Sequence, residues 1–128
     1  MLGKSVPGLA AVMGLLALAG AGTQAQAADP AAGKAVFSSV CSICHSPQPG
    51  KNGVGPSLFG IVGSKTGAVP GFHFSPANLN ANLTWDQATL DRYLQSPRTV
   101  IPRTTMTYAG LKDDTKRADL IAYLATLK

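Results

Sequence analysis

The sequence predicts one small helical domain that follows a short N-terminal leader. The chain has only 128 residues, three stretches carry helix signals, and the long segment between the first two shows no sustained strand alternation. Hydrophobic residues make up 45% of the chain and charged residues 13%, which is too apolar for a disordered protein. Two cysteines exclude a disulfide-dense scaffold, and the lack of repeated spans excludes a multi-pass membrane protein.

The leader, residues 1–27, has the layout of a cleaved secretory signal peptide. Lys4 gives a positive start, residues 9–21 are uninterrupted small and apolar residues, and Ala25-Gln26-Ala27 offers a peptidase cleavage site. The apolar run of 13 residues is shorter than the roughly 20 that span a bilayer. An uncleaved N-terminal anchor is the alternative. Cleavage after Ala27 would leave residues 28–128 as an exported domain, in the periplasm if the organism is a bacterium.

The first helix is predicted to begin at Asp29-Pro30. An acid that caps the helix is followed there by proline at the first helical position. Val36, Phe37 and Val40 would form its apolar face.

The second helix is predicted to begin at Thr84, where Gln87 completes a capping box, and to end before Pro97. Its apolar face would be formed by Leu90, Tyr93 and Leu94.

The third helix shows the clearest pattern. Asp113 and Asp114 stand at its start, where the helix dipole favours acids, and Lys128 stands at its end. Between them, apolar residues recur at helical spacing: Leu120, Ile121, Leu124 and Leu127, with Tyr123 beside them.

Nearly forty residues between His45 and Thr84 form a segment rich in glycine and proline. A loop of this length in a compact domain usually has a functional reason. It is too irregular to make a core alone, so we expect it to wrap around another object.

The pentapeptide Cys41-Ser42-Ile43-Cys44-His45 is the attachment signature of c-type haem. The spacing lets two thiols add across the two vinyl groups of one porphyrin edge, and the histidine that follows is directed at the iron. A redox dithiol usually comes with a βαβ pattern, which is not visible here. A disulfide across two residues would be strained. Zinc needs four ligands, and the only other histidine is His73.

The second axial position of such a haem has three candidates. Met106 is the only methionine after the leader, and it ends the segment Ile101–Met106 just before the third predicted helix. Pro97 and Pro102 predict a stiff, non-helical strap here, which suits a ligand pressed against the second haem face. His73, between Phe72 and Phe74, is the second candidate, although a place near the haem edge suits it better. The third is an open site.

Several motifs in order give the chain a close resemblance to class I cytochromes c, both mitochondrial and bacterial periplasmic. The resemblance covers residues 33–127. It rests on CSICH at 41–45, GPSLFGIVGSKTGAVPGF at 55–72, TW at 84–85, YLQSP at 93–97, IPRTTM at 101–106 and KRADLIAYL at 116–124.

The resemblance implies an all-α fold around one covalent haem. Cys41 and Cys44 would hold the vinyl groups, and His45 and Met106 would be the axial ligands. The Pro56 carbonyl would accept a hydrogen bond from His45 and so orient the imidazole. The resemblance also implies that Tyr93 places its hydroxyl near the Met106 sulfur and that Asn78 joins a buried polar network there. Trp85 and Thr104 would donate hydrogen bonds to the haem propionates. The first and last helices would cross where Gly33 and Phe37 meet Leu120 and Tyr123.

The sequence also departs from the family pattern. Ser64 and Phe74 stand where an arginine and a tyrosine often approach the inner propionate, and His73 is the residue that would partly substitute. Val40 and Thr105 stand where the mitochondrial members of the family carry lysine, so the ring of surface lysines is less dense here. The basic residues that remain as candidates for a positive face are Lys34, Lys51, Lys65, Arg98, Arg103, Lys112 and Lys116.

Two filled axial positions leave no site for a substrate, so the expected function is one-electron transfer and not catalysis. A soluble monomer with a mildly basic face is expected to contact membrane redox complexes: a quinol-oxidising complex upstream, and a respiratory terminal oxidase or a photosynthetic reaction centre downstream. Weak membrane-surface contact fits this charge, whereas export argues against nucleic acid. The alternatives are a haem enzyme or sensor with a labile Met106, and an electron-entry module of a periplasmic dehydrogenase.

Overall fold

The computed structural model describes residues 1–5, 8, 20, 22 and 26–128. Most of the apolar run at 9–21 and Ala25 of the cleavage site lie outside the described residues, so the signal peptide and its cleavage after Ala27 stay predictions. Among the described residues, no helix has both the length and the apolar character to cross a membrane.

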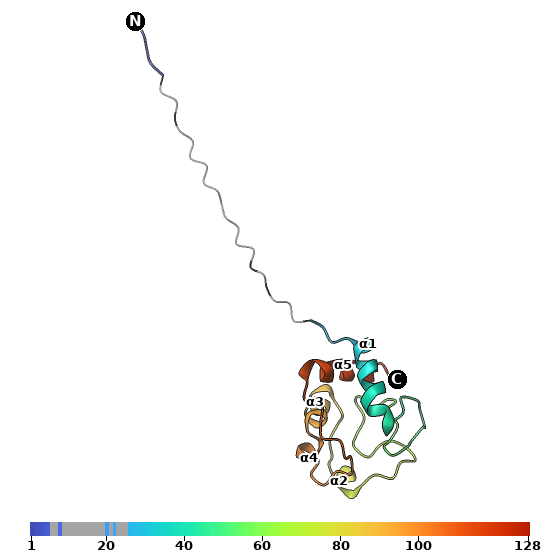
Figure 1. The fold of residues 1–128 in the computed structure, drawn as a ribbon. Coiled ribbons are helices and arrows are strands. Elements are labelled where there is room, and N and C mark those ends of the chain that lie inside the picture. The colour runs from blue at the N-terminus through green and yellow to red at the C-terminus, as the bar shows by residue number, and fades with distance from the viewer. Residues whose placement is uncertain (6–7, 9–19, 21, 23–25) are drawn as a thin grey trace.

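The described domain is all-α, as predicted, with three main helices and three short helical turns. In chain order these are α1 (Pro30–Val40), η1 (Cys41–Ile43), α2 (Pro76–Leu79), α3 (Gln87–Gln95), α4 (Pro97–Val100) and α5 (Asp114–Ala125). In Figure 1, α1 and α5 lie together at the end of the domain where the N-terminal tail enters. The only β pairing in the described part of the chain is an isolated bridge between Lys65 and Thr84.

Aspartates cap the three main helices. The predicted cap of α1 is confirmed, because the Asp29 side chain accepts a hydrogen bond from the Ala31 N–H and Pro30 occupies the first turn. Asp113 caps α5 in the same way through the Lys116 N–H. Helix α5 ends at Ala125, so Leu127 lies just beyond the predicted helical pattern.

The predicted start of the second helix at Thr84 is wrong. Helix α3 begins at Gln87, and its cap is Asp86, whose side chain accepts from the Thr89 N–H at 2.8 Å. Thr84 is extended instead, paired with Lys65. The capping-box pattern at Thr84 competed with a second good cap two residues later, and the pairing with the loop decided between them.

The expectation of a wholly non-helical strap after Pro97 is also wrong. Pro97 does end α3, but it then starts the short helix α4, in which proline occupies the first turn. The irregular part of the strap begins after Val100 and comprises residues 101–111. Its first residue, Ile101, is only 2% exposed and belongs to the core.

Gly33 allows α1 and α5 to cross at close range. A Cβ atom at Gly33 would lie 1.9 Å from the Asp119 carbonyl oxygen and 2.9 Å from Tyr123 Cβ. Phe37, one turn later, is buried with its ring centroid 5.5 Å from that of Tyr123, and Leu120 is 1% exposed in the same core. The crossing predicted for these four residues is confirmed.

The long loop is held to the helices by backbone hydrogen bonds rather than by a sheet. Gly63 donates to the Trp85 carbonyl at 2.9 Å, and Trp85 donates back to Ser64 at 2.8 Å. Gly60 donates to the Leu127 carbonyl at 2.7 Å, beyond the end of α5. These bonds fasten the middle of the loop, residues 60–64, to Trp85 just before α3 and to the C-terminus.

Gly33→Ala should destabilise the fold by about 2 kcal/mol, because the added methyl group overpacks the α1–α5 crossing. Ser38→Ala, at an exposed position of α1, is the matched control and should change the unfolding free energy by less than about 0.5 kcal/mol. Chemical denaturation of the purified protein measures both. Equal midpoints for the two variants would show that the crossing tolerates a side chain.

Candidate haem site

The two cysteines lie on a single turn at the end of α1. The η1 turn holds them there, with Cys44 N–H and His45 N–H both donating to the Cys41 carbonyl, at 3.1 and 2.9 Å. The two cysteines are not joined in a disulfide, and both are half-buried. Burial, reinforced by the nearby Cys44, raises the pKa of Cys41 to about 11. The Cys41 thiol is therefore protonated at neutral pH, with little tendency to react as a thiolate.

His45 is oriented by the backbone of the loop. Its Nδ1 lies 2.7 Å from the Pro56 carbonyl oxygen, so Nδ1 must carry the proton. Burial lowers the pKa of His45, against the opposing effect of the Pro56 hydrogen bond. The ring is thus neutral at pH 7, with the lone pair of Nε2 available to a metal.

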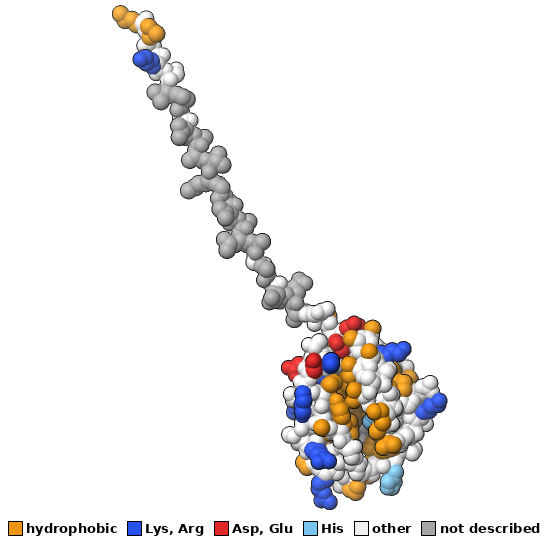
Figure 2. Space-filling model, viewed as in Figure 1, with side chains coloured by type: hydrophobic (Ala, Val, Ile, Leu, Met, Phe, Trp, Pro, Cys, Tyr) orange, Lys and Arg blue, Asp and Glu red, His pale blue; other side chains and the backbone are white. Residues whose placement is uncertain are grey.

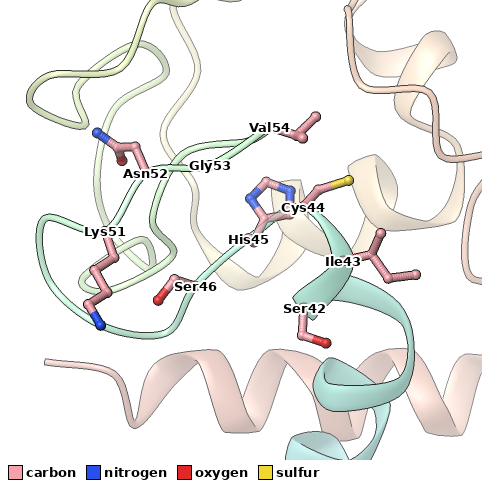
Figure 3. Close-up of a pocket in the computed structure, with 9 residues that line it drawn as sticks. All are labelled: Ser42, Ile43, Cys44, His45, Ser46, Lys51, Asn52, Gly53 and Val54. Carbon is pink, nitrogen blue, oxygen red and sulfur yellow. The ribbon is translucent and has the colours of Figure 1, made fainter.

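Gly55 makes room for this imidazole. A Cβ atom at Gly55 would lie 2.3 Å from His45 Cε1 and 2.9 Å from Nε2. Figure 3 shows the ring between the Cys44 turn and the Gly53–Val54 segment. His45 and these two segments help to line a hollow of about 440 Å³. Gly55 was not singled out from the sequence, although its position directly before Pro56 is a usable signal.

Met106 lies half-buried in the strap, against the core and a pair of hydroxyl groups. The Tyr93 hydroxyl donates to Met106 Sδ at 3.5 Å and lies 3.2 Å from Thr104 Oγ1. Thr104 Oγ1 also accepts from the Met106 N–H at 3.3 Å. Tyr93 in turn packs on Trp85 with ring centroids 4.8 Å apart. The side chains of Trp85, Tyr93, Thr104 and Met106 therefore form one connected group.

The strap and the cysteine turn lie close to each other. Tyr108, two residues after Met106, has a pKa raised first by burial and then by its proximity to Cys41. The segment that carries Met106 therefore passes near the segment that carries the two thiols. This proximity agrees with the expectation that the strap lies near the haem.

Asn78, at the end of α2, contributes an unsatisfied polar atom. Its Oδ1 is buried and has no hydrogen-bond partner within the described part of the protein. An orphaned buried oxygen is costly, so an additional donor belongs there. A bound polar group or an ordered water would supply it.

The departures from the family pattern are visible in the loop. The Ser64 hydroxyl donates to the Ile61 carbonyl at 2.7 Å and is thereby engaged. Phe74 packs edge-on against Phe72, with ring centroids 4.9 Å apart, and carries no donor. His73 between them is exposed. Neither Ser64 nor Phe74 replaces the arginine or tyrosine that the family often has.

These residues fit a covalently bound haem. Two thiols on one turn, a neutral imidazole with a free Nε2, and a thioether sulfur on a separate segment make a suitable donor set. The orphaned Asn78 oxygen and the hollow beside His45 are consistent with a large polar-edged ligand. Figure 2 shows hydrophobic side chains gathered around a depression in the middle of one face of the domain.

Comparison with known proteins gives the same assignment. The family model for cytochrome c matches residues 30–128. Cytochrome c2 of Rhodomicrobium vannielii is 52% identical over 101 residues, covering 78% of this chain and 80% of the relative. Cytochrome c of Euglena viridis is 43% identical over 100 residues, covering 78% and 98%. The solved structure of cytochrome cH from Methylobacterium extorquens has a TM-score of 0.72 and 45% identity, and covers 77% of this chain and 98% of its own.

The family confirms the prediction that the protein is an electron carrier and not an enzyme. It also confirms the prediction of one covalent haem on Cys41 and Cys44. An N-terminal extension precedes the matched residues. Because the family model matches residues 30–128 and the relatives are similar over most of their length, this chain belongs to the cytochrome c family. It is a mono-haem electron carrier of the cytochrome c2 type.

Proposed function

We propose that this protein carries single electrons between membrane redox complexes in the periplasm, with His45 and Met106 as the axial ligands of its haem. The observation that carries the proposal is that both donors are held by hydrogen bonds: Pro56 orients the imidazole of His45, and Tyr93 and Thr104 hold Met106. The bound haem supplies an iron that alternates between the ferrous and ferric states.

The protein holds each proposed ligand before any metal binds. The Pro56 carbonyl fixes the tautomer of His45, and Gly55 leaves its ring unobstructed. The Thr104 hydroxyl fixes the Met106 backbone, while the Tyr93 hydroxyl donates to its sulfur and withdraws electron density from it. A soft thioether favours ferrous iron, and this hydrogen bond adds to that preference. Preorganised ligands that need not move suit fast electron transfer without catalysis.

The surface charge supports partners with acidic surfaces. The six acidic residues are all engaged within the described domain: Asp29, Asp86 and Asp113 cap helices, Asp91 and Asp114 pair with Arg117, and Asp119 accepts from the Asp29 N–H. The seven residues predicted to form a basic face are all exposed. Figure 2 shows acidic side chains at the tail end of the domain and basic ones around the rest of this face. Uncommitted positive charge steers association towards negative surfaces.

The leader and the start of the fold agree with export. The signal-like residues 1–27 precede the helix cap at Asp29, so cleavage after Ala27 would leave the fold intact. Covalent attachment would keep the haem on an exported protein. We expect a quinol-oxidising complex as donor, and a terminal oxidase or a photosynthetic reaction centre as acceptor.

Met106→Ala should keep the haem attached and lower the midpoint potential by on the order of 100 mV, within the roughly 0.8 V range that axial ligands control. The weak long-wavelength sulfur-to-iron absorption band of the oxidised protein should disappear. Thr105→Ala, at the exposed neighbouring position, should keep both the band and the potential. If the band were absent from the unmodified protein and the iron high-spin, the enzyme or sensor alternative would replace the electron carrier.

Gly55→Ala should displace the His45 imidazole, because the new methyl group would overlap the ring. We expect a lower yield of haem-loaded protein and a shifted midpoint potential in what remains. Gly53→Ala is the matched control, since its Cβ would lie 3.2 Å from the nearest atom, the Cys44 carbonyl oxygen. Redox titration of both variants makes the comparison. A Gly55→Ala protein with normal yield and potential would contradict this role of Gly55.

Reduction of ferricyanide, an anionic oxidant, should slow as salt increases, because salt screens its attraction to the basic surface. Arg98→Glu, beside Thr107 and Tyr108 of the strap, should slow this reaction by on the order of tenfold at low salt. Lys128→Glu makes the same charge change at the C-terminus and should have a smaller effect. Stopped-flow measurements give the rates. Rates that do not depend on salt and are equal in the two variants would contradict electrostatic attraction by the basic surface.

A further inference from the structure

Arg117 is a buried cation that joins three parts of the chain. It lies on α5 with a side chain only 5% exposed. Its Nε donates to Asp91 Oδ1 on α3 at 2.6 Å, its Nη1 to the Leu111 carbonyl at 2.9 Å, and its Nη2 to Asp114 Oδ1 at 2.7 Å. A buried charge is tolerated only with such partners, and the planar guanidinium can serve three of them at once.

The Leu111 carbonyl belongs to the end of the strap that carries Met106, and this end is pressed against α3. Leu111 N–H donates to the Leu94 carbonyl at 2.7 Å. A Cβ atom at Gly110, whose φ is +119°, would lie 2.1 Å from the Gln95 carbonyl oxygen, and the Lys112 ammonium also donates to that oxygen. Helix α3 therefore holds the N–H of Leu111, while Arg117 on α5 holds its C=O.

The strap between its two ends has little support of its own. Ile101 anchors the first end in the core, and Thr104 N–H donates to the Ile101 carbonyl at 3.0 Å. From there to Gly110, the only backbone N–H of the described strap with a hydrogen bond is that of Met106, which donates to Thr104 Oγ1. Apart from the hydrogen bonds with Thr104 and Tyr93, the position of Met106 thus depends on the anchors at the ends of the strap.

We propose that Arg117 is a positioning residue for Met106: by fixing the carbonyl of Leu111 it keeps the strap taut and opposes the displacement of the Met106 sulfur from the iron by competing ligands. This inference rests on the proposed axial role of Met106. Freeing one end of the strap increases the fraction of molecules in which the sulfur is away from the iron. The apparent affinity for a competing ligand rises in proportion to that fraction.

Imidazole binding to the oxidised, haem-loaded protein tests the proposal. Arg117→Lys keeps the positive charge but cannot reach three acceptors in a fork, and should lower the apparent Kd for imidazole by on the order of tenfold. Gly110→Ala, which pushes the strap away from Gln95 without altering Arg117, should act in the same direction. Asp114→Asn removes the charge of one exposed partner and leaves the Leu111 bond, so its Kd should stay within about twofold of the unmodified protein.

Gly33→Ala separates positioning from general loss of stability, because it disturbs the α1–α5 crossing without touching the strap. The unfolding free energy of each variant is measured alongside the imidazole Kd. The proposal requires a larger change in Kd for Arg117→Lys than for Gly33→Ala at equal loss of stability. It is overturned if the two variants follow one relation between Kd and stability, or if Arg117→Lys leaves the Kd unchanged.

The Met106→Ala protein identifies which statement has failed. If the unmodified protein binds imidazole as tightly as Met106→Ala does, Met106 is not the ligand, and both the proposed ligation and the role of Arg117 fall. If Met106→Ala binds imidazole much more tightly but Arg117→Lys does not, the ligation stands and only the positioning role is lost.

Discussion

The crossing of α1 and α5 at Gly33 is the contact on which the rest of the structure depends. Helix α1 ends in the turn that carries Cys41 and Cys44, and α5 begins directly after the strap that carries Met106. Because Gly33 has no side chain, the two helices approach until the Asp119 carbonyl almost fills the space of its missing Cβ. One short-range contact thereby joins the helix that precedes the cysteine turn to the helix that follows the strap.

Features governed by local chemistry could be predicted from the sequence. The Asp29 and Asp113 caps, the apolar face of α5 and the pentapeptide with its histidine depend on neighbouring residues, and the structure has the helices where those signals stand. The start of α3 could not be predicted as well, because Thr84 and Asp86 are both acceptable caps. Only the pairing of Thr84 with Lys65, which is distant in sequence, selects Asp86.

The site shows the same division. The donor atoms could be named from residue types, and the family resemblance added the contacts of His45 with Pro56 and of Tyr93 with Met106, which the structure contains at hydrogen-bond distance. Thr104 bonds both Tyr93 and Met106, beyond the propionate role that the resemblance implied. The three bonds of Arg117 could not be foreseen, since an arginine in the first turns of an amphipathic helix normally faces water. Its burial follows from where α3 and the strap end are placed, which only the tertiary fold determines.

The complete engagement of the acidic residues has a consequence for how the molecule turns in an electric field. The carboxylates of the described domain serve as caps and as partners of Arg117 and the α1 backbone, and on the face drawn in Figure 2 they gather near the tail end. Among the exposed lysines and arginines of the described domain, only Lys112 and Arg92 make hydrogen bonds of this kind, to the Gln95 carbonyl and to Thr89. Such a separation of charge gives the molecule a permanent dipole, so the field of a negative surface exerts a torque on it before contact. The end of the domain formed by α1 and α5 would point away from the negative surface. The molecule would then spend less time in rotational diffusion before each productive encounter.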